Sequence, residues 1–244
     1  MSAKNSVKRG NRILSNKFVL VVILAIIFGV TTPRIVEATQ LFTYTGDVLP
    51  SLDSWTIKNY PAYEATGAHI ESGVLHFTDF STSGGSAIHY TRQWQVNPLE
   101  INVAEFDIKG VSCLSYAGIY FGTSDGQYNM LYTVYANRIA SSSGLGGGDN
   151  PNYTYYFNTT TQFNTYKAVI EAGTARLYIN GGLVLEQPAN LGKYNVIGIE
   201  FGAGSSAATG EAYFDEIRAF AIPEPATLLL LGFGGLALIR KHRA

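Results

Sequence analysis

Residues 166–186 read YKAVIEAGTARLYINGGLVLE and decide the fold class of this chain. Asn180-Gly181 separates two apolar runs, and this dipeptide favours a two-residue hairpin turn because both turn positions require positive φ. Ala172-Gly173 interrupts the stretch a second time, so three antiparallel strands are predicted. Apolar residues alternate along them and can share one face. These residues are Ala168, Ile170, Leu177, Ile179, Leu183 and Leu185.

The rest of the chain between residues 39 and 221 has the same character. Aromatic and β-branched residues gather in short segments that turn residues separate, as is typical of strands. No segment keeps a helical period over ten residues. We therefore predict an all-β fold, in which two sheets form a sandwich or a barrel. The other predicted strands are 73–80, 102–111, 116–121, 128–134, 153–157, 195–202 and 211–220.

Charge divides the 244 residues into three parts, although their formal sum is only −1. Residues 1–38 carry six basic residues and one acid, residues 39–221 carry eight basic and sixteen acidic residues, and the last residues are basic again. Basic ends around an acidic body are typical of a chain whose ends are recognised by proteins in the membrane. The acidic body argues against nucleic acid as a partner, because phosphate binding needs clustered Lys and Arg.

The N-terminal part has the organisation of a secretion signal. Residues 18–30 are an unbroken apolar run, which as a helix is about 20 Å long and shorter than the ~30 Å hydrocarbon core. Val36 and Ala38 have small side chains, as signal peptidase requires at the third-last and last positions before its cut, so cleavage is expected after Ala38. We predict a signal peptide at 1–38, with an uncleaved anchor as the alternative.

The C-terminal part, residues 222–244, begins with Pro223-Glu224-Pro225. Two prolines so close prevent a regular helix or central strand, so this motif should be extended and exposed. Residues 226–239 are an apolar run of about 21 Å as a helix, followed by a basic tail that would stay cytoplasmic. A short transmembrane helix is therefore expected here.

These three parts, in this order, resemble the PEP-CTERM sorting signal. The resemblance implies that Pro223, Glu224 and Pro225 are recognised by an exosortase, a membrane cysteine protease-transpeptidase. It also implies an association with exopolysaccharide or biofilm matrix. A plain C-terminal anchor is the alternative.

The body, residues 39–221, carries a second resemblance. The order YKAVIEAGTARLYINGGLVL, IGIEFG, AYFDEIRAF, together with GIYFGTSDGQYNMLYTVY at 118–135, resembles concanavalin A-like or laminin-G-like jelly-roll domains. The resemblance spans about 70–221 and implies a two-sheet antiparallel jelly-roll sandwich.

Reactive motifs are mostly absent from the sequence. There is no Walker A, G-x-G-x-x-G or H-E-x-x-H motif. His69, His76 and His89 show no paired metal spacing and are interpreted as structural. Laminarinase-like members of the jelly-roll fold use a strand E-x-D-x-x-E, of which Glu105 and Asp107 supply the first two positions and Gly110 replaces the third. We therefore expect no enzyme activity and interpret Glu105 and Asp107 as an exposed strand face.

Ligand binding stays open in the sequence. Sugars are held by aromatic faces and polar side chains, and Trp55 and Trp94 are candidates for the aromatic part. The glycine-rich segment 141–152, expected to be a hairpin tip, offers Asp149 and Asn150 to a ligand or to calcium. No other cofactor is expected, and the sequence assigns no metal site.

We thus expect an exported, exosortase-sorted protein of the cell surface or extracellular matrix, held at least transiently in the membrane by residues 226–239. Its sandwich is expected to be non-catalytic, with carbohydrate binding as an open role. A polysaccharide-active enzyme, either a glycoside hydrolase or a lyase, and a purely structural coat or adhesion protein are the alternatives. Expected partners are signal peptidase, the exosortase and extracellular polysaccharide.

Overall fold

The computed structural model divides the chain into two units, residues 1–37 and 38–244. All residues that the structure describes belong to the second unit. They are 39–59, 67–79, 88–93, 100–109, 117–122, 128–142, 149–171, 173–191, 198–203 and 210–223.

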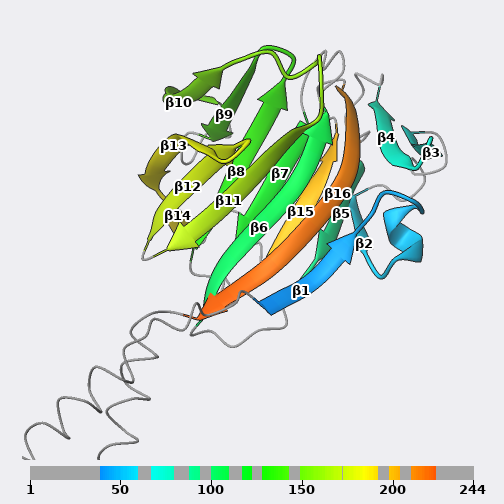
Figure 1. Cartoon of the computed structure of the whole chain (residues 1–244), viewed down its shortest axis with the longest axis horizontal. Helices are drawn as coiled ribbons and strands as arrows, with labels where there is room; N and C mark the ends of the chain where they lie inside the picture. Colours follow the sequence, from blue (N-terminus) through cyan, green and yellow to red (C-terminus); the bar gives the residue numbers. More distant parts are fainter. Residues whose placement is uncertain are drawn as a thin grey trace, which may run out of the picture. The chain divides into compact units, whose positions relative to one another are not determined.

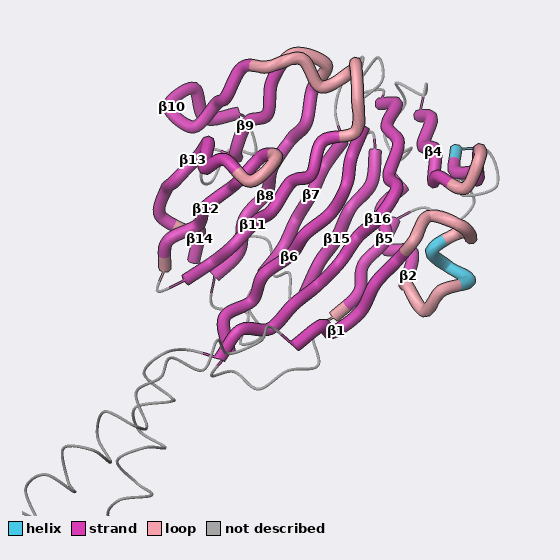
Figure 2. Tube along the Cα trace, viewed as in Figure 1, coloured by secondary structure: helices cyan, strands magenta, loops and turns pink. Residues whose placement is uncertain are grey.

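The described residues form two antiparallel eight-stranded sheets (Figures 1 and 2). Sheet A has the order β13-β12-β11-β6-β16-β4-β3, with β1 paired to β16, and sheet B has the order β10-β9-β8-β7-β15-β5-β2, with β14 paired to β8. Sheet A comprises β1 (Thr39–Tyr44), β3 (Ala68–Glu71), β4 (Val74–Asp79), β6 (Glu100–Lys109), β11 (Asn164–Glu171), β12 (Thr174–Ile179), β13 (Gly182–Pro188) and β16 (Gly210–Pro223). Sheet B comprises β2 (Thr56–Asn59), β5 (Ile88–Arg92), β7 (Ala117–Gly122), β8 (Tyr128–Tyr135), β9 (Arg138–Ser142), β10 (Asp149–Tyr156), β14 (Asn190–Leu191) and β15 (Gly198–Ala203).

The predicted all-β, two-sheet antiparallel fold is confirmed. A short 3-10 turn, η1 (Pro50–Leu52), lies between β1 and β2. The predicted signal helix, the cleavage site at Ala38 and the apolar segment 226–239 lie outside the described residues. Within the part of the chain that the structure describes, no helix is long and apolar enough to cross a membrane.

The Asn180-Gly181 hairpin is present, with φ of 50° at Asn180 and 84° at Gly181. One prediction in this region is wrong, because Leu183 is 53% exposed whereas Leu185 is buried. Leu177 pairs with Leu185 but Tyr178 pairs with Leu183, so Val184 is an extra residue on its strand. This β-bulge turns Leu183 to the outer face, because every inserted residue reverses the alternation.

The core lies between the two sheets and is rich in aromatic rings. Phe201 of β15 is at its centre, with ring centroids 4.9 Å from Phe214, 5.0 Å from Trp55 and 5.8 Å from Tyr90. Trp55 itself is only 4% exposed. The contact with Trp55 is edge-to-face and the other two are tilted, and aromatic contacts in such arrangements stabilise the core beyond the area that they bury.

Two further boundaries differ from the sequence-based expectation. Asp149 and Asn150 were expected in a hairpin tip but belong to β10, the edge strand of sheet B. The closing strand β16 is longer than predicted and ends at Pro223, which pairs with Glu100. The first proline of the Pro-Glu-Pro motif is therefore the last residue of a strand. Proline has no N–H to donate to a neighbouring strand, and this loss matters less at the end of a strand than in its interior.

Candidate functional site

The central strands of sheet B are buried on both faces. Ile119, Phe121, Ile199 and Phe201 point into the core, yet the residues that alternate with them are also largely shielded from solvent. A sheet in a two-layer sandwich normally leaves its second face in water. We call this second face, which points away from the core, the outward face of sheet B.

A buried histidine and a buried carboxylate meet on this outward face. His89 Nδ1 lies 2.9 Å from Glu200 Oε1, and the two residues are only 5% and 2% exposed. The pairing of β5 with β15 brings them together, since His89 lies opposite Gly202 and Thr91 lies opposite Glu200. A carboxylate beside one ring nitrogen fixes the tautomer and orientation of a histidine, which is one requirement of acid–base chemistry.

Tyr120 and a set of glycines surround this pair. The Tyr120 ring centroid lies 5.8 Å from that of His89, and Tyr120 pairs directly with Glu200. On either side of that pair, two glycines face each other across β7 and β15. These facing pairs are Gly118 with Gly202 and Gly122 with Gly198.

The outward face thus combines bare backbone with a few polar side chains. Glycine has no side chain, so only backbone lies beside Tyr120, His89 and Glu200 at these positions. Thr133 and Asn129 of β8 continue the polar row, since they pair with Gly118 and Gly122. Aromatic, hydroxyl, amide and carboxylate groups at fixed positions are what a site for a polar ligand such as a sugar requires.

The two carboxylates on the described strands of sheet B are too far apart to form a hydrolytic pair. Among the described strands of this sheet, only Glu200 of β15 and Asp149 of β10 carry a carboxylate. Three strands separate β15 from β10, which makes four strand spacings, or about 19 Å. Glycoside hydrolases need about 5 Å for retention and at most about 9.5 Å for inversion.

Glu105 and Asp107 belong to the other sheet. They lie on β6 in the centre of sheet A, where Glu105 pairs with Lys167 and with Arg218. The E-x-D segment therefore does not contribute to the outward face of sheet B, and Gly110 lies outside the described residues.

The ligand residues expected from the sequence are not brought together among the described residues. The Trp55 ring is buried in the core, so it has no exposed face for a sugar, and Trp94 lies outside the described residues. Asp149 accepts hydrogen bonds from the Tyr135 hydroxyl at 3.0 Å and from Arg138 Nη2 at 3.1 Å. Asn150 Oδ1 accepts from the Asn152 amide at 3.0 Å. A ligand-binding role for Asp149 and Asn150 stays a prediction.

Asp149 and burial act together on Tyr135. Burial, together with the smaller effect of the Asp149 carboxylate, raises the pKa of the Tyr135 hydroxyl to about 12. The Arg138 guanidinium lies over the Tyr135 ring at 3.8 Å from its centroid. These contacts form a local polar network at the edge of sheet B.

A second cluster that the sequence-based interpretation missed lies on sheet A. His69, Glu71 and His76 bring one ligand atom each to within 4.8 Å of one another. The signal in the sequence is Ser72-Gly73, a turn dipeptide that places His69 opposite His76 across a hairpin. A search for histidines at fixed spacings along one strand overlooks a pair formed across two strands.

Comparison with known proteins identifies a motif at the C-terminus and solved structures with a similar fold. Residues 221–244 match the family model described as the PEP-CTERM protein-sorting motif. No curated protein matches the sequence.

Similar solved structures include a Crh5 transglycosylase, at 14% identity and a TM-score of 0.51, covering 78% of this chain and 89% of that one. They also include the laminarinase catalytic domain from Thermotoga maritima, at 9% identity and a TM-score of 0.52, covering 75% of this chain and 98% of that one. A third comes from work on endo-acting O-glycanases of the human gut microbiota, at 12% identity and a TM-score of 0.52, covering 75% of this chain and 100% of that one.

At these identities the structural likeness shows the fold alone. The sorting motif indicates export and sorting to the cell surface. The chain therefore joins a PEP-CTERM protein-sorting motif to a jelly-roll sandwich of the concanavalin A-like type.

Proposed function

We propose that this chain is an exported protein of the cell surface or extracellular matrix whose sandwich binds an extracellular polysaccharide without cleaving it. The observation that carries the proposal is the PEP-CTERM match at residues 221–244. Signal peptidase would cleave after Ala38, and an exosortase would recognise Pro223, Glu224 and Pro225. Residues 226–239 would hold the chain in the membrane until that step.

The outward face of sheet B supports a sugar as the ligand. It places Tyr120, His89 and Glu200 beside two pairs of facing glycines. The solved structures of similar fold carry names that refer to a transglycosylase, a laminarinase and O-glycanases, which supports polysaccharide as the ligand class.

The carboxylate arrangement supports binding without hydrolysis. Glu200 and Asp149 are about 19 Å apart by strand spacing, well beyond the separation of a hydrolytic pair. Asp149 is moreover occupied by Tyr135 and Arg138.

A glycan array probed with the full-length chain tests this proposal. We expect a signal on a defined polysaccharide class that Tyr120→Ala and Glu200→Gln each reduce at least about tenfold, as loss of an orienting polar contact in a binding site would. Tyr178→Ala is the matched control, because Tyr178 is a half-buried tyrosine on the outer side of sheet A. No signal above background, with and without calcium, would instead favour a purely structural coat or adhesion protein.

A polysaccharide-active enzyme is the second candidate, and the His89–Glu200 contact favours it. An oriented histidine can take a proton from a sugar carbon or give one to a leaving oxygen, as in eliminative cleavage. The full-length chain incubated with the array-positive polysaccharide distinguishes the two candidates, with new reducing ends and unsaturated products as readouts. Products that His89→Gln abolishes would establish the enzyme; intact polymer with retained binding would support the binding protein.

A further inference from the structure

The β3–β4 hairpin places two histidines directly opposite each other. Its two turn residues, Ser72 and Gly73, have φ of 55° and 78°, as a two-residue hairpin turn of type I′ requires. This turn fixes the register, so that His69 pairs with His76. Glu71 follows His69 by two residues and therefore shares its face of the sheet.

The potential ligand atoms lie at distances that suit one metal ion. His76 Nδ1 is 3.1 Å from His69 Nε2 and 3.3 Å from Glu71 Oε2, and the last two atoms are 4.0 Å apart. Ligands about 2.0 Å from a tetrahedral zinc ion are separated from one another by about 3.3 Å. Two of the three distances already match this value, and the third needs a shift of less than 1 Å by exposed side chains.

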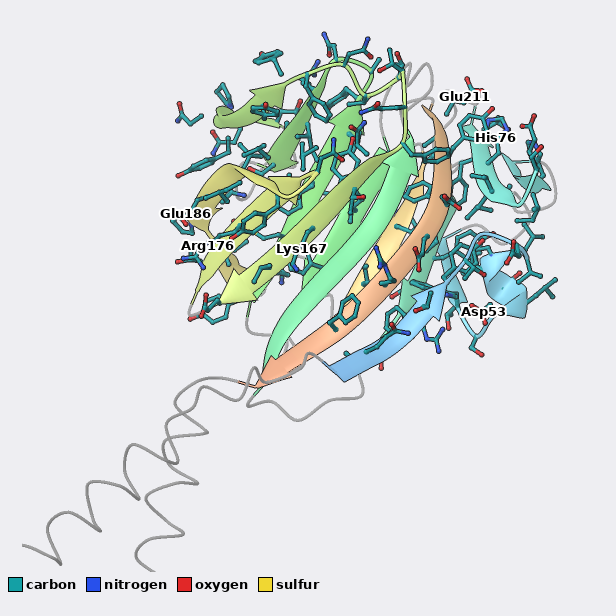
Figure 3. The ribbon with its side chains drawn as sticks, in the orientation of Figure 1. Asp53, His76, Lys167, Arg176, Glu186 and Glu211 are labelled. Atoms are coloured by element: carbon teal, nitrogen blue, oxygen red, sulfur yellow. The ribbon has the colours of Figure 1, made fainter. Side chains whose placement is uncertain are left out.

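Contacts around these ligands hold His76 in place. Its second ring nitrogen, Nε2, lies 3.1 Å from Glu211 Oε1 (Figure 3 shows the two side chains near the start of β16). Its ring also stacks on Tyr213, with centroids 4.0 Å apart and planes 6° from parallel. A histidine ligand of a metal almost always gives its second ring N–H to a carboxylate or carbonyl group.

Glu71 is held in a similar way. A hydrogen bond joins it to Tyr213, whose pKa is raised by partial burial and by the charges of Glu71 and Glu211. Tyr213 therefore touches two of the three potential ligands, His76 with its ring and Glu71 with its hydroxyl. Such outer contacts pre-organise a site before the ion arrives.

We propose that His69 Nε2, His76 Nδ1 and Glu71 Oε2 bind a divalent transition metal of the zinc class, with Glu211 and Tyr213 as positioning residues. Two imidazole nitrogens and one carboxylate suit zinc, whereas calcium and magnesium prefer oxygen donors alone. His69 and Glu71 side chains are 52% and 56% exposed, so a fourth position on the ion is open to water or to an incoming donor. The ion would join β3 to β4 at the edge of sheet A.

Calorimetric titration of the chelator-treated full-length chain with Zn²⁺ tests the proposal. We expect one ion per chain, and His69→Ala and Glu71→Gln should each weaken binding by at least about 100-fold because each removes a ligand. Glu211→Gln should weaken binding about 10- to 100-fold although it removes no ligand, since outer contacts have effects of that size. His69 and Glu71 are exposed, so their replacement does not endanger the fold.

Glu186→Gln is the matched control, because Glu186 is an exposed carboxylate (52%) on β13, at the opposite edge of sheet A, where it contacts Arg176 (Figure 3). Its Zn²⁺ affinity should equal that of the unmodified chain. Co²⁺ absorption provides a second readout, in which strong visible bands that His69→Ala removes report four-coordinate binding by imidazole. Absence of stoichiometric Zn²⁺ binding, or affinity that survives both His69→Ala and Glu71→Gln, would overturn the proposal and leave the cluster as hydrogen-bonded imidazoles and carboxylates.

Discussion

His89 Nδ1 lies 2.9 Å from Glu200 Oε1 on a face of the sheet that points away from the core, although 111 residues separate the two along the chain. Both side chains are almost completely buried. Burial of such a pair is tolerated only when each group retains its partner. Removal of either partner should therefore have a measurable effect on stability.

Glu200→Ala leaves the buried His89 ring without this partner. We expect the free energy of unfolding to fall by about 1–3 kcal/mol, measured by urea unfolding of the full-length chain. Glu186→Ala, which removes an exposed carboxylate from sheet A, should leave the unfolding midpoint nearly unchanged. Equal effects of the two variants would mean that His89 does not depend on Glu200.

Because of the bulge at Val184, we expect substitutions of two leucines on one strand to change the free energy of unfolding by different amounts. Leu185→Ala should lower the free energy of unfolding by about 2–4 kcal/mol, because Leu185 is buried in the core. Leu183→Ala should change it by less than about 0.5 kcal/mol, because the side chain is exposed. Urea unfolding of both variants checks the register; a large effect of Leu183→Ala would place this leucine in the core and contradict the bulge.

Tyr135 predicts a loss of stability at alkaline pH. Its pKa is about 12 in the folded chain and 10.0 without the fold, so its contribution is complete below pH 10 and falls as the pH rises from 10 towards 12. Tyr135→Phe removes this contribution, and its unfolding midpoint should fall less between those two pH values than that of the unmodified chain. Burial also raises the pKa of Tyr44 and Tyr132, so part of the alkaline loss will persist. If the unfolding midpoints of both proteins fell equally between pH 10 and 12, Tyr135 would ionise as readily in the folded chain as in the unfolded chain.

Removal of residues 226–244 should change where the protein accumulates. The deletion begins after Pro225 because β16 pairs with β6 as far as Pro223, and a shorter chain would also disturb the sheet. In the native host we expect the truncated protein to lose surface retention, measured by immunoblots of surface, membrane and medium fractions. Leu183→Ala, a surface change in the body, is the control and should be sorted normally. Unchanged sorting of the truncated chain would contradict a role for this segment.

The sequence alone was sufficient where the physics is local. A strand alternates its side chains with a period of two, so Ala168, Ile170, Leu177, Ile179 and Leu185 could be assigned to one apolar face, and all of them are buried. Asn180-Gly181 adopts the positive φ values that its turn requires. The PEP-CTERM segment was likewise readable because a sorting signal is a linear motif.

The candidate sites depended on the tertiary structure. Alternation does not reveal which strands become neighbours, so it could not bring His89 of β5 to Glu200 of β15. It could not predict that the central strands of sheet B are buried on both faces, nor that Trp55 points into the core. The Val184 bulge was missed because one residue without a counterpart is visible only in the pairing of two strands.

The cluster of His69, Glu71 and His76 depends partly on local sequence and partly on the tertiary structure. Its hairpin was readable, because Ser72-Gly73 places His69 opposite His76. Only the folded chain brings Glu211 and Tyr213, more than 130 residues away, against the His76 ring. The sequence by itself thus determined the all-β class, the apolar face of the strands in 166–186 apart from Leu183, and the sorting motif, since these follow from neighbouring residues. The tertiary structure decided which polar groups meet, because that depends on the order in which distant strands pair.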